Sequence, residues 1–387
     1  RRYIGGESVK MDDRNDINKF RQKTKRRSLY LRLGIALFAV LAVILIAVNW
    51  DRLISPFKDA ALDIGSGGFP VALPGSTEYV MDELGDNFYL MTDTYLYTYN
   101  SNGANIASIQ HGFQNPVSDS NSKRVMIYDR NGKGFKFYSR AAEVYSNVLD
   151  DTIVFGSIGT GERCAVVTTS SRYSNYLYVF NGEGKQIFRW ASPENKIMQV
   201  CFSNNDNSIF VSVIGEKGGE LRLGVMRFDL NNSESAIWQT DTGSSVTYSL
   251  QYTPEGIYVV TADGALLLDS ESGEVKARNS FTKSIFGIPE TDGLRAVIFN
   301  DSGFNGETVV AYNEELSAEF SLTPDRITAF DVSGGTLYLL SGSKLRVYDS
   351  SLMGIKEYEL DDVYGGVKII GGNAYLLGYN SVQRQEL

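Results

Sequence analysis

Side chains that commonly do chemistry at neutral pH are scarce in this chain of 387 residues. It contains one histidine, His111, and two cysteines, Cys164 and Cys201. A zinc site or a histidine-based catalytic triad needs more than this, and the cysteine count excludes a disulfide framework. His111 is predicted to be an ordinary exposed or hydrogen-bonded side chain. The cysteines fall in neighbouring repeats whose strands do not generally pair, so two buried thiols are favoured over a disulfide.

Carboxylates are plentiful but poorly placed for joint chemistry. Adjacent acidic residues occur in three pairs: Asp82/Glu83, Glu314/Glu315 and Asp361/Asp362. Two carboxylates can cleave a glycoside, but neighbours on a strand point to opposite faces. Two acidic segments, Asp129–Gly132 and Asp269–Gly273, are too short for calcium, which takes about six or more oxygen ligands. The sequence therefore predicts tight turns here, with no metal site and no cofactor.

The elements that carry the histidine, the cysteines and the carboxylates are predicted to be short β-strands and the turns between them. The segment Tyr176–Trp190 has the pattern of strand, turn and strand, because Tyr176, Tyr178 and Phe180 alternate with aliphatic residues at a period of two. The turn Asn181–Gly184 contains residue types that tolerate the positive φ of a tight hairpin. The same pattern recurs along most of the chain, so the hairpin is interpreted as one part of a repeated unit.

The repeats align on a residue, usually Asn or Asp, that ends the third strand of each unit. These positions are Asn100, Ser139, Asn181, Asp229, Asp269, Asn313 and Asp349. The steps between them run from 36 to 48 residues. A repeat of roughly 40 residues made of short strands is typical of a β-propeller with four-stranded blades.

Eight second strands can be counted, which predicts an all-β, eight-bladed propeller over residues 69–387. Seven blades are the alternative if the second unit, which has Ser139 in place of Asn or Asp, folds irregularly. The last unit ends with a third strand at Ser381–Leu387 and lacks a fourth. We expect Phe69–Leu73 to supply that outer strand, because an unclosed ring would expose an edge or a face.

Long turns are the candidate binding elements. In such a blade the second-to-third turns and the blade-to-blade connections share one side of the disc, here named the connection face; the other turns lie on the opposite turn face. Three second-to-third turns are long: Ser170–Asn175, Gly215–Glu220 and Asp301–Gly306. Their candidate recognition residues are Arg172, Tyr173, Lys217 and Phe304. Neutral drift of exposed loops is the alternative explanation.

One apolar run stands out near the N-terminal end. From Leu33 to Trp50 no residue is charged, and with the three residues before it the run reaches the roughly 20 residues that a helix needs to cross a bilayer. Arg32 can snorkel to one interface, and Trp50 suits the other. The sequence predicts a transmembrane helix over 30–50, inserted in a lipid bilayer, and a tether over 51–68. A cleaved signal peptide and a buried core helix are the alternatives.

Charge is divided unevenly along the chain. Residues 1–50 hold 11 Lys+Arg against 4 Asp+Glu, a balance of +7, which leaves 26 against 42, or −16, for residues 51–387. Because basic residues precede the apolar run, the tail over 1–29 is predicted to be cytoplasmic and the body extracytoplasmic, at a bacterial cytoplasmic membrane. Met11 is interpreted as the translation start. The acidic body argues against nucleic acid as a partner.

Two stretches, VFNGEGKQIFRW ending at Trp190 and LLLDSESGEVKA beginning at Leu266, resemble the PQQ-type repeats of quinoprotein-alcohol-dehydrogenase-like and WD40-like propellers. Anchor and body together resemble an uncharacterised bacterial family of single-pass, membrane-anchored propellers. The resemblance implies a fold and a location. The regular tryptophan ring of the quinoproteins is missing, since the body holds only Trp190 and Trp238, so quinone binding is not expected.

These features favour a non-enzymatic binding or scaffold protein whose partner is an extracytoplasmic protein or an envelope polymer. The alternatives are a cell-envelope enzyme acting on glycan or quinone, and a transmembrane sensor that signals through its tail. Geometry adds one expectation. Because Phe69–Leu73 must run from the turn face to the connection face, the tether should meet the turn face, and the connection face should point away from the membrane.

Overall fold

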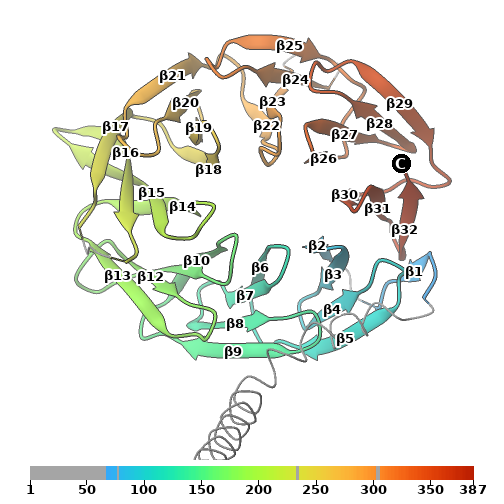
Figure 1. The fold of residues 1–387 in the computed structure, drawn as a ribbon, viewed down its shortest axis with the longest axis horizontal. Helices are drawn as coiled ribbons and strands as arrows, with labels where there is room; N and C mark the ends of the chain where they lie inside the picture. The colour runs from blue at the N-terminus through green and yellow to red at the C-terminus, as the bar shows by residue number, and fades with distance from the viewer. Residues whose placement is uncertain (1–66, 76–77, 232–234, 302–305) are drawn as a thin grey trace, which may run out of the picture. The chain divides into compact units, whose positions relative to one another are not determined.

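Eight four-stranded antiparallel sheets form a closed ring in the computed structural model of the chain (Figure 1). The structure describes residues 67–75, 78–231, 235–301 and 306–387. These residues form strands and turns, and none of them belongs to a helix of the length and apolarity needed to cross a membrane. The predicted helix over 30–50, with the tail and most of the tether, lies outside the described residues.

Each blade runs from an inner strand at the axis of the ring to an outer strand at its circumference. Blade 1 contains β2 (Val80–Leu84), β3 (Asn87–Met91), β4 (Tyr95–Tyr99) and β5 (Asn105–Gln110). Blade 2 contains β6 (Pro116–Ser120), β7 (Val125–Asp129), β8 (Gly134–Tyr138) and β9 (Glu143–Val148). Blade 3 contains β10 (Ile153–Ile158), β11 (Cys164–Thr168), β12 (Asn175–Phe180) and β13 (Gln186–Ser192). Blade 4 contains β14 (Lys196–Phe202), β15 (Ser208–Lys217), β16 (Glu220–Asp229) and β17 (Trp238–Gly243).

The second half of the ring repeats this order. Blade 5 contains β18 (Thr247–Thr253), β19 (Gly256–Thr261), β20 (Gly264–Leu268) and β21 (Val275–Ser280). Blade 6 contains β22 (Ile285–Gly287), β23 (Arg295–Asn300), β24 (Glu307–Tyr312) and β25 (Ala318–Leu322). Blade 7 contains β26 (Ala329–Ser333), β27 (Thr336–Ser341), β28 (Lys344–Tyr348) and β29 (Gly354–Glu359). Blade 8 contains β30 (Gly366–Ile370), β31 (Asn373–Leu377), β32 (Ser381–Glu386) and β1 (Val71–Ala72).

The hydrophobic core is divided among the junctions between blades. Second strands such as β3 and β11 are buried along their whole length, as expected for strands covered on both faces, whereas outer strands such as β21 alternate between exposed and half-buried residues. The buried residues form eight clusters, and each cluster joins one pair of neighbouring blades. Blades therefore depend on their neighbours for burial.

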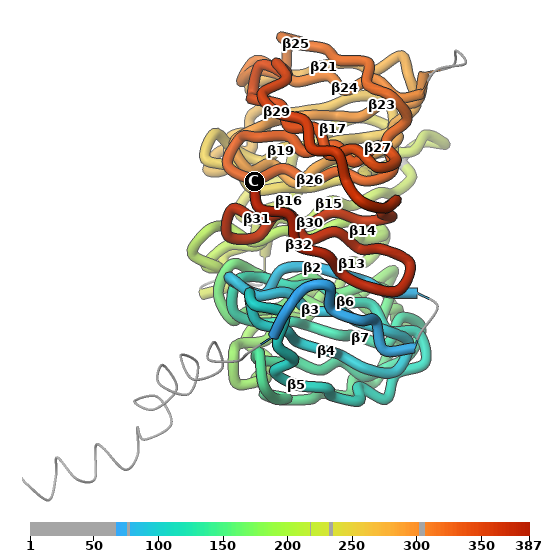
Figure 2. The backbone as a smooth tube through the Cα atoms, turned by 90° about the vertical axis from the view of Figure 1, so that its right-hand side faces the viewer, coloured from blue at the N-terminus to red at the C-terminus, as the bar shows by residue number. Residues whose placement is uncertain are grey.

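The ring closes as predicted. Strand β1 pairs antiparallel with β32, with Val71 opposite Val382, and the side chain of Val71 is 6% exposed within the cluster between blades 8 and 1. Figure 2 shows the first and last coloured segments side by side. Phe69 adds an edge-on contact to Tyr375 at 5.7 Å. The second unit forms a regular four-stranded blade, so the count of eight is confirmed and the seven-bladed alternative is wrong.

The Asn or Asp used to align the repeats caps the third-to-fourth turn in blades 1–7, except in blade 2, where Ser139 stands at this position. Asn181 Oδ1 accepts hydrogen bonds from the backbone N–H groups of Glu183 and Lys185, at 3.1 and 2.9 Å. The side chain at the divergent position does the same, because Ser139 Oγ accepts from the N–H of Ala142 at 3.2 Å. A short side chain with an acceptor oxygen thus bonds the backbone N–H groups of the turn, which have no partner on a neighbouring strand.

Substitution of the closing strand tests the ring. The change Val71→Asp buries a carboxylate without a partner and is expected to lower the free energy of unfolding by about 3–5 kcal/mol, measured by urea unfolding of the full chain. The control is Val275→Asp, because Val275 also lies in an outer strand but is 41% exposed, and its cost should stay below about 0.5 kcal/mol. Equal destabilisation by both changes would contradict a special role for closure.

Candidate functional site

Two of the predicted recognition residues lie where the sequence placed them. Arg172 and Tyr173 belong to the turn between β11 and β12 on the connection face of blade 3, and both are exposed. The hydroxyl of Ser170 accepts hydrogen bonds of 3.1 Å from the backbone N–H of each residue, which shapes the turn. The turn thus presents both side chains to solvent from a fixed backbone.

Tyr173 continues an aromatic ladder along β12. Its ring lies edge-on to Tyr176 at 5.5 Å, and Tyr176 lies 5.8 Å from Tyr178, the next residue on the same side of the strand. Arg189 of β13, opposite Tyr178 in register, places its guanidinium 4.1 Å from the Tyr176 ring and 5.4 Å from the Tyr178 ring. Such stacking orients the guanidinium. These residues, with Arg172, are named the tyrosine–arginine patch.

The patch is cationic on an acidic body. Neither Arg172 nor Arg189 forms an ion pair with any carboxylate of the described residues, although Asp150 and Asp151 lie close enough to act on Tyr178. Burial raises the pKa of Tyr178, Arg189 opposes this, and the two aspartates add to it. The hydroxyl of Tyr178 therefore stays protonated at neutral pH. Tyrosine and arginine are residue types enriched in protein-binding hot spots.

The other two predicted recognition residues, Lys217 and Phe304, are not part of this patch. The prediction of a long loop over Gly215–Glu220 is wrong, because β15 and β16 continue as a hairpin in which Lys217 pairs with Glu220. Gly218 and Gly219, with φ of 67° and 86°, form a two-residue turn that lets the strands extend to its edge. Lys217 is a strand residue at the tip of this arm, and Phe304 lies outside the described residues.

His111 has a structural position. It is 1% exposed, its Nε2 donates to the carbonyl of Thr92 at 3.2 Å, and its Nδ1 accepts from the backbone N–H of Phe113 at 3.2 Å. Both ring nitrogens are thus occupied in the neutral form. Burial lowers the pKa of His111, which keeps that form at neutral pH. The prediction of a hydrogen-bonded histidine is confirmed.

The cysteines and acidic turns are also accounted for locally. Cys164 and Cys201 are free thiols, as favoured, although only Cys164 is fully buried and Cys201 is half-buried. Burial raises the pKa of Cys164 to about 12 and also raises that of Cys201, which opposes thiolate formation. Asp269 Oδ1 accepts from the backbone N–H groups of Ser272 and Glu271, and these bonds hold the pKa of Asp269 well below its usual range. Within the described ranges, no group of three or more His, Cys, Asp or Glu side chains is placed to hold a metal ion.

Sequence reasoning missed charged side chains on the inner strands. Asp119 of β6 accepts a hydrogen bond of 2.8 Å from the backbone N–H of Ile158 in β10, and Asp331 of β26 accepts one of 2.7 Å from Ile369 in β30. Each carboxylate thus binds the inner strand of the next blade. Burial raises the pKa of Asp119 to about 6 and also raises the pKa of Asp331. Both carboxylates therefore have a structural role, because each accepts a hydrogen bond that joins two neighbouring blades.

A third inner-strand contact links the last blade to the first. Lys368 Nζ of β30 lies 2.9 Å from Asp82 Oδ1 of β2 and 3.9 Å from Asp331 Oδ1. The sequence does contain a signal for Asp82, Asp331 and Lys368. Each of them lies seven residues before the tyrosine that it faces on the next strand. The three tyrosines are Tyr89, Tyr338 and Tyr375. The seven-residue spacing indicates the hairpin formed by the first two strands of a blade, and it does not indicate a catalytic site.

The raised pKa of Asp119 predicts a pH dependence. Its folded pKa of about 6 exceeds the ordinary 3.8, so the folded state binds more protons between these values and the stability falls as pH rises from about 4 to 6. Asp119→Asn keeps an acceptor for Ile158 and removes the charge. We expect the variant to be about 1–2 kcal/mol more stable than the parent at pH 7 and similar at pH 4, by urea unfolding. An unchanged pH slope would contradict the assignment.

Comparison with known proteins agrees with the fold. The structure of BamB from Moraxella catarrhalis matches with a TM-score of 0.55 and 12% identity over 82% of this chain and 96% of that one. Sqt1 from Saccharomyces cerevisiae matches with a TM-score of 0.60 and 9% identity over 82% and 98%. The C-terminal WD40 domain of Sif2 matches with a TM-score of 0.57 and 11% identity over 84% and 99%.

Sequence comparison identifies the relatives of the chain at the family level. A search of curated proteins finds no significant match. A family model does match, over residues 74–383, which covers the propeller from the residue after Leu73 to the middle of β32. The model describes a family of unknown function. The chain therefore belongs to that family, DUF5711.

Proposed function

We propose that the protein is a membrane-anchored, extracytoplasmic propeller that binds a protein or a cell-envelope component and acts as a scaffold, without catalysing a reaction. One observation carries this proposal: the tyrosine–arginine patch on the connection face of blade 3. Aromatic rings and stacked guanidinium groups supply large contact area and directed hydrogen bonds at a low cost in conformational entropy.

The charge and rigidity of the patch support binding. Tyr178 is buried at the junction with blade 2, and Tyr176 is half-buried beside it. The exposed Tyr173 and Arg189 rest on these ordered rings, so a partner meets a surface that is already fixed. Arg172 and Arg189 leave hydrogen-bond donors available for acidic or carbonyl groups of a partner. The likeness to other propellers supports the fold alone, since this architecture hosts many activities.

The path of the chain supports the proposed orientation. Gly67 and Gly68 lie beside Asn102, in the third-to-fourth turn of blade 1, so the chain enters β1 from the turn face. The tyrosine–arginine patch lies on the connection face, at the other side of the propeller. With the apolar run Leu33–Trp50 as the anchor, a tether that reaches the turn face leaves the patch free for extracytoplasmic partners.

Photo-crosslinking in intact cells tests the binding surface. A benzophenone amino acid in place of Tyr173 is expected to crosslink a discrete partner, and Arg189→Ala should weaken that product roughly tenfold. The matched control is the same replacement at Tyr379, which is 98% exposed in the second-to-third turn of blade 8. Identical products at both positions, or none at position 173, would refute the patch as the binding surface.

Cysteine labelling tests the location. Met353 is 66% exposed on the turn face of blade 7, so Met353→Cys offers a reactive thiol. Cys164 and Cys201 should give little background, because burial raises the pKa of both. A membrane-impermeant maleimide is expected to label the variant equally in intact and lysed cells. Labelling that appears only after lysis would place the propeller in the cytoplasm and overturn the proposal.

A further inference from the structure

A groove on the turn face crosses three blades, at the side of the propeller opposite the tyrosine–arginine patch. Its volume is about 400 Å³, within the range of roughly 300–1,000 Å³ that is usual for small-molecule sites. Blade 5 contributes Glu255, blade 6 contributes Arg295 and Glu319, and blade 7 contributes Ser351. We name it the Arg295 groove.

Arg295 lines this groove, and only one of its three guanidinium nitrogens is hydrogen-bonded within the described residues. The residue is 9% exposed, and its Nη2 donates to Glu255 Oε2 at 2.5 Å. Its Nε has no hydrogen-bond partner among the described residues, but it is buried too deeply for a molecule in the groove to reach it. Nη1 also forms no hydrogen bond within the described residues and is not buried in this way, so it is the donor available to an acceptor from outside the chain. The hydroxyl of Tyr258, which acts electrostatically with Arg295, is buried and unpartnered as well.

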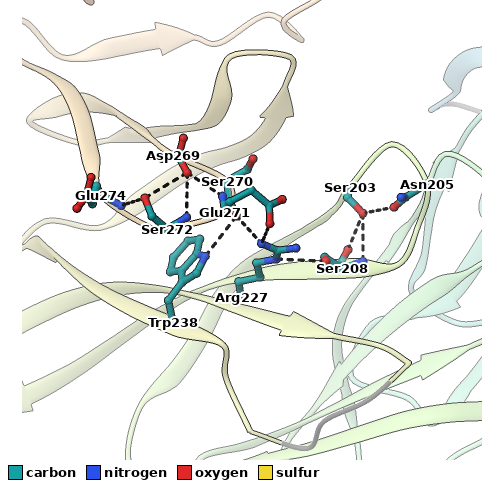
Figure 3. A network of polar contacts seen from close by, with 10 residues as sticks. All are labelled: Ser203, Asn205, Ser208, Arg227, Trp238, Asp269, Ser270, Glu271, Ser272 and Glu274. Carbon is teal, nitrogen blue, oxygen red and sulfur yellow. Dashed lines mark hydrogen bonds and ion pairs between the residues drawn. The ribbon is translucent and has the colours of Figure 1, made fainter.

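A second groove, between blades 4 and 5, also pairs an arginine with a glutamate, but there the arginine has more acceptors. In this Arg227 groove of about 340 Å³, Nε of Arg227 donates to Ser208 Oγ at 3.3 Å and Nη1 donates to the carbonyl of Ser270 at 3.1 Å (Figure 3). Nη1 also lies 2.5 Å from Glu271 Oε2. The described residues therefore supply three acceptors to Arg227 and only one to Arg295.

The charges of the Arg295 groove restrict the ligand. Burial opposes ionisation of Glu255, but hydrogen bonds from its own backbone and from Thr253, together with Arg295, lower its pKa, so the ion pair is charged. Glu314 and Glu319 lie exposed on the rim. The lining holds three carboxylates against one guanidinium, which disfavours anionic ligands.

Hydroxyl groups meet all of these requirements. A hydroxyl oxygen accepts from the Nη1 group of Arg295, and other hydroxyls donate to Glu319 and to Ser351. The ring of Phe320 and the ring of Pro254 supply apolar walls for C–H groups. We propose that the Arg295 groove binds a neutral, hydroxyl-rich ligand of the saccharide class. This site is independent of the patch and gives the propeller a second ligand.

Saccharide binding to the full chain in detergent tests the proposal. The probes are neutral hexose and N-acetylhexosamine oligosaccharides, with hexuronic-acid oligosaccharides as the anionic comparison, measured by calorimetry. We expect neutral probes to bind and anionic probes to bind at least roughly tenfold more weakly. Glu319→Gln combined with Ser351→Ala, both at exposed or half-buried rim positions, should weaken neutral binding by a similar factor.

Two controls keep the result specific. Glu271→Gln in the Arg227 groove and Tyr173→Ala in the patch should leave saccharide binding unchanged, and thermal unfolding checks that each variant is folded. The proposal fails if no neutral saccharide binds, which would leave the Nη1 donors of Arg295 to water. It also fails if anionic probes bind equally, or if the rim variant binds as well as the parent. Loss of partner crosslinking at Tyr173 bears only on the patch.

Discussion

The burial of each blade against its two neighbours is the constraint on which the rest of the structure depends. Every one of the eight hydrophobic clusters draws side chains from two blades, so a blade removed from the ring would expose both faces. A linear array would leave two such faces at its ends. Strand β1 removes that problem because it completes blade 8 with chain from the start of the propeller, and Lys368 adds an ionic contact across the same junction.

Much of this architecture could be predicted from the sequence because it repeats. The period-two pattern of Tyr176–Phe180 and the acceptor side chain at Asn181 recur along the chain, and both have local causes in strand pleating and turn capping. The closing strand could be predicted by counting, since the last unit lacked a fourth strand and Phe69–Leu73 had no unit of its own. Local rules and a count were sufficient for the fold.

Features that depend on contacts between blades could not be predicted in this way. Asp119 and Ile158 are 39 residues apart, and Glu255 and Arg295 are 40 apart, so no local pattern shows that they meet. The prediction of a loop between β15 and β16 was wrong for a different reason. Gly218 and Gly219 were interpreted as loop residues, although two consecutive glycines at positive φ also make the shortest hairpin turn. Tyr173 could be assigned to an exposed loop, but its contact with Tyr176 required the structure.

The two proposed sites relate to the ring in different ways. Tyr173 and Arg189 both belong to blade 3, so a partner on these exposed residues contacts one sheet, next to the junction where Tyr178 is buried against blade 2. The Arg295 groove takes Glu255, Arg295 and Ser351 from three successive blades. A ligand there binds only the closed arrangement, and ligand binding confined to the folded state stabilises it by mass action. Occupancy of the turn face thus favours the ordered ring, and the ordered ring presents the patch on the connection face. The geometry couples the two faces through stability, without requiring a change of shape.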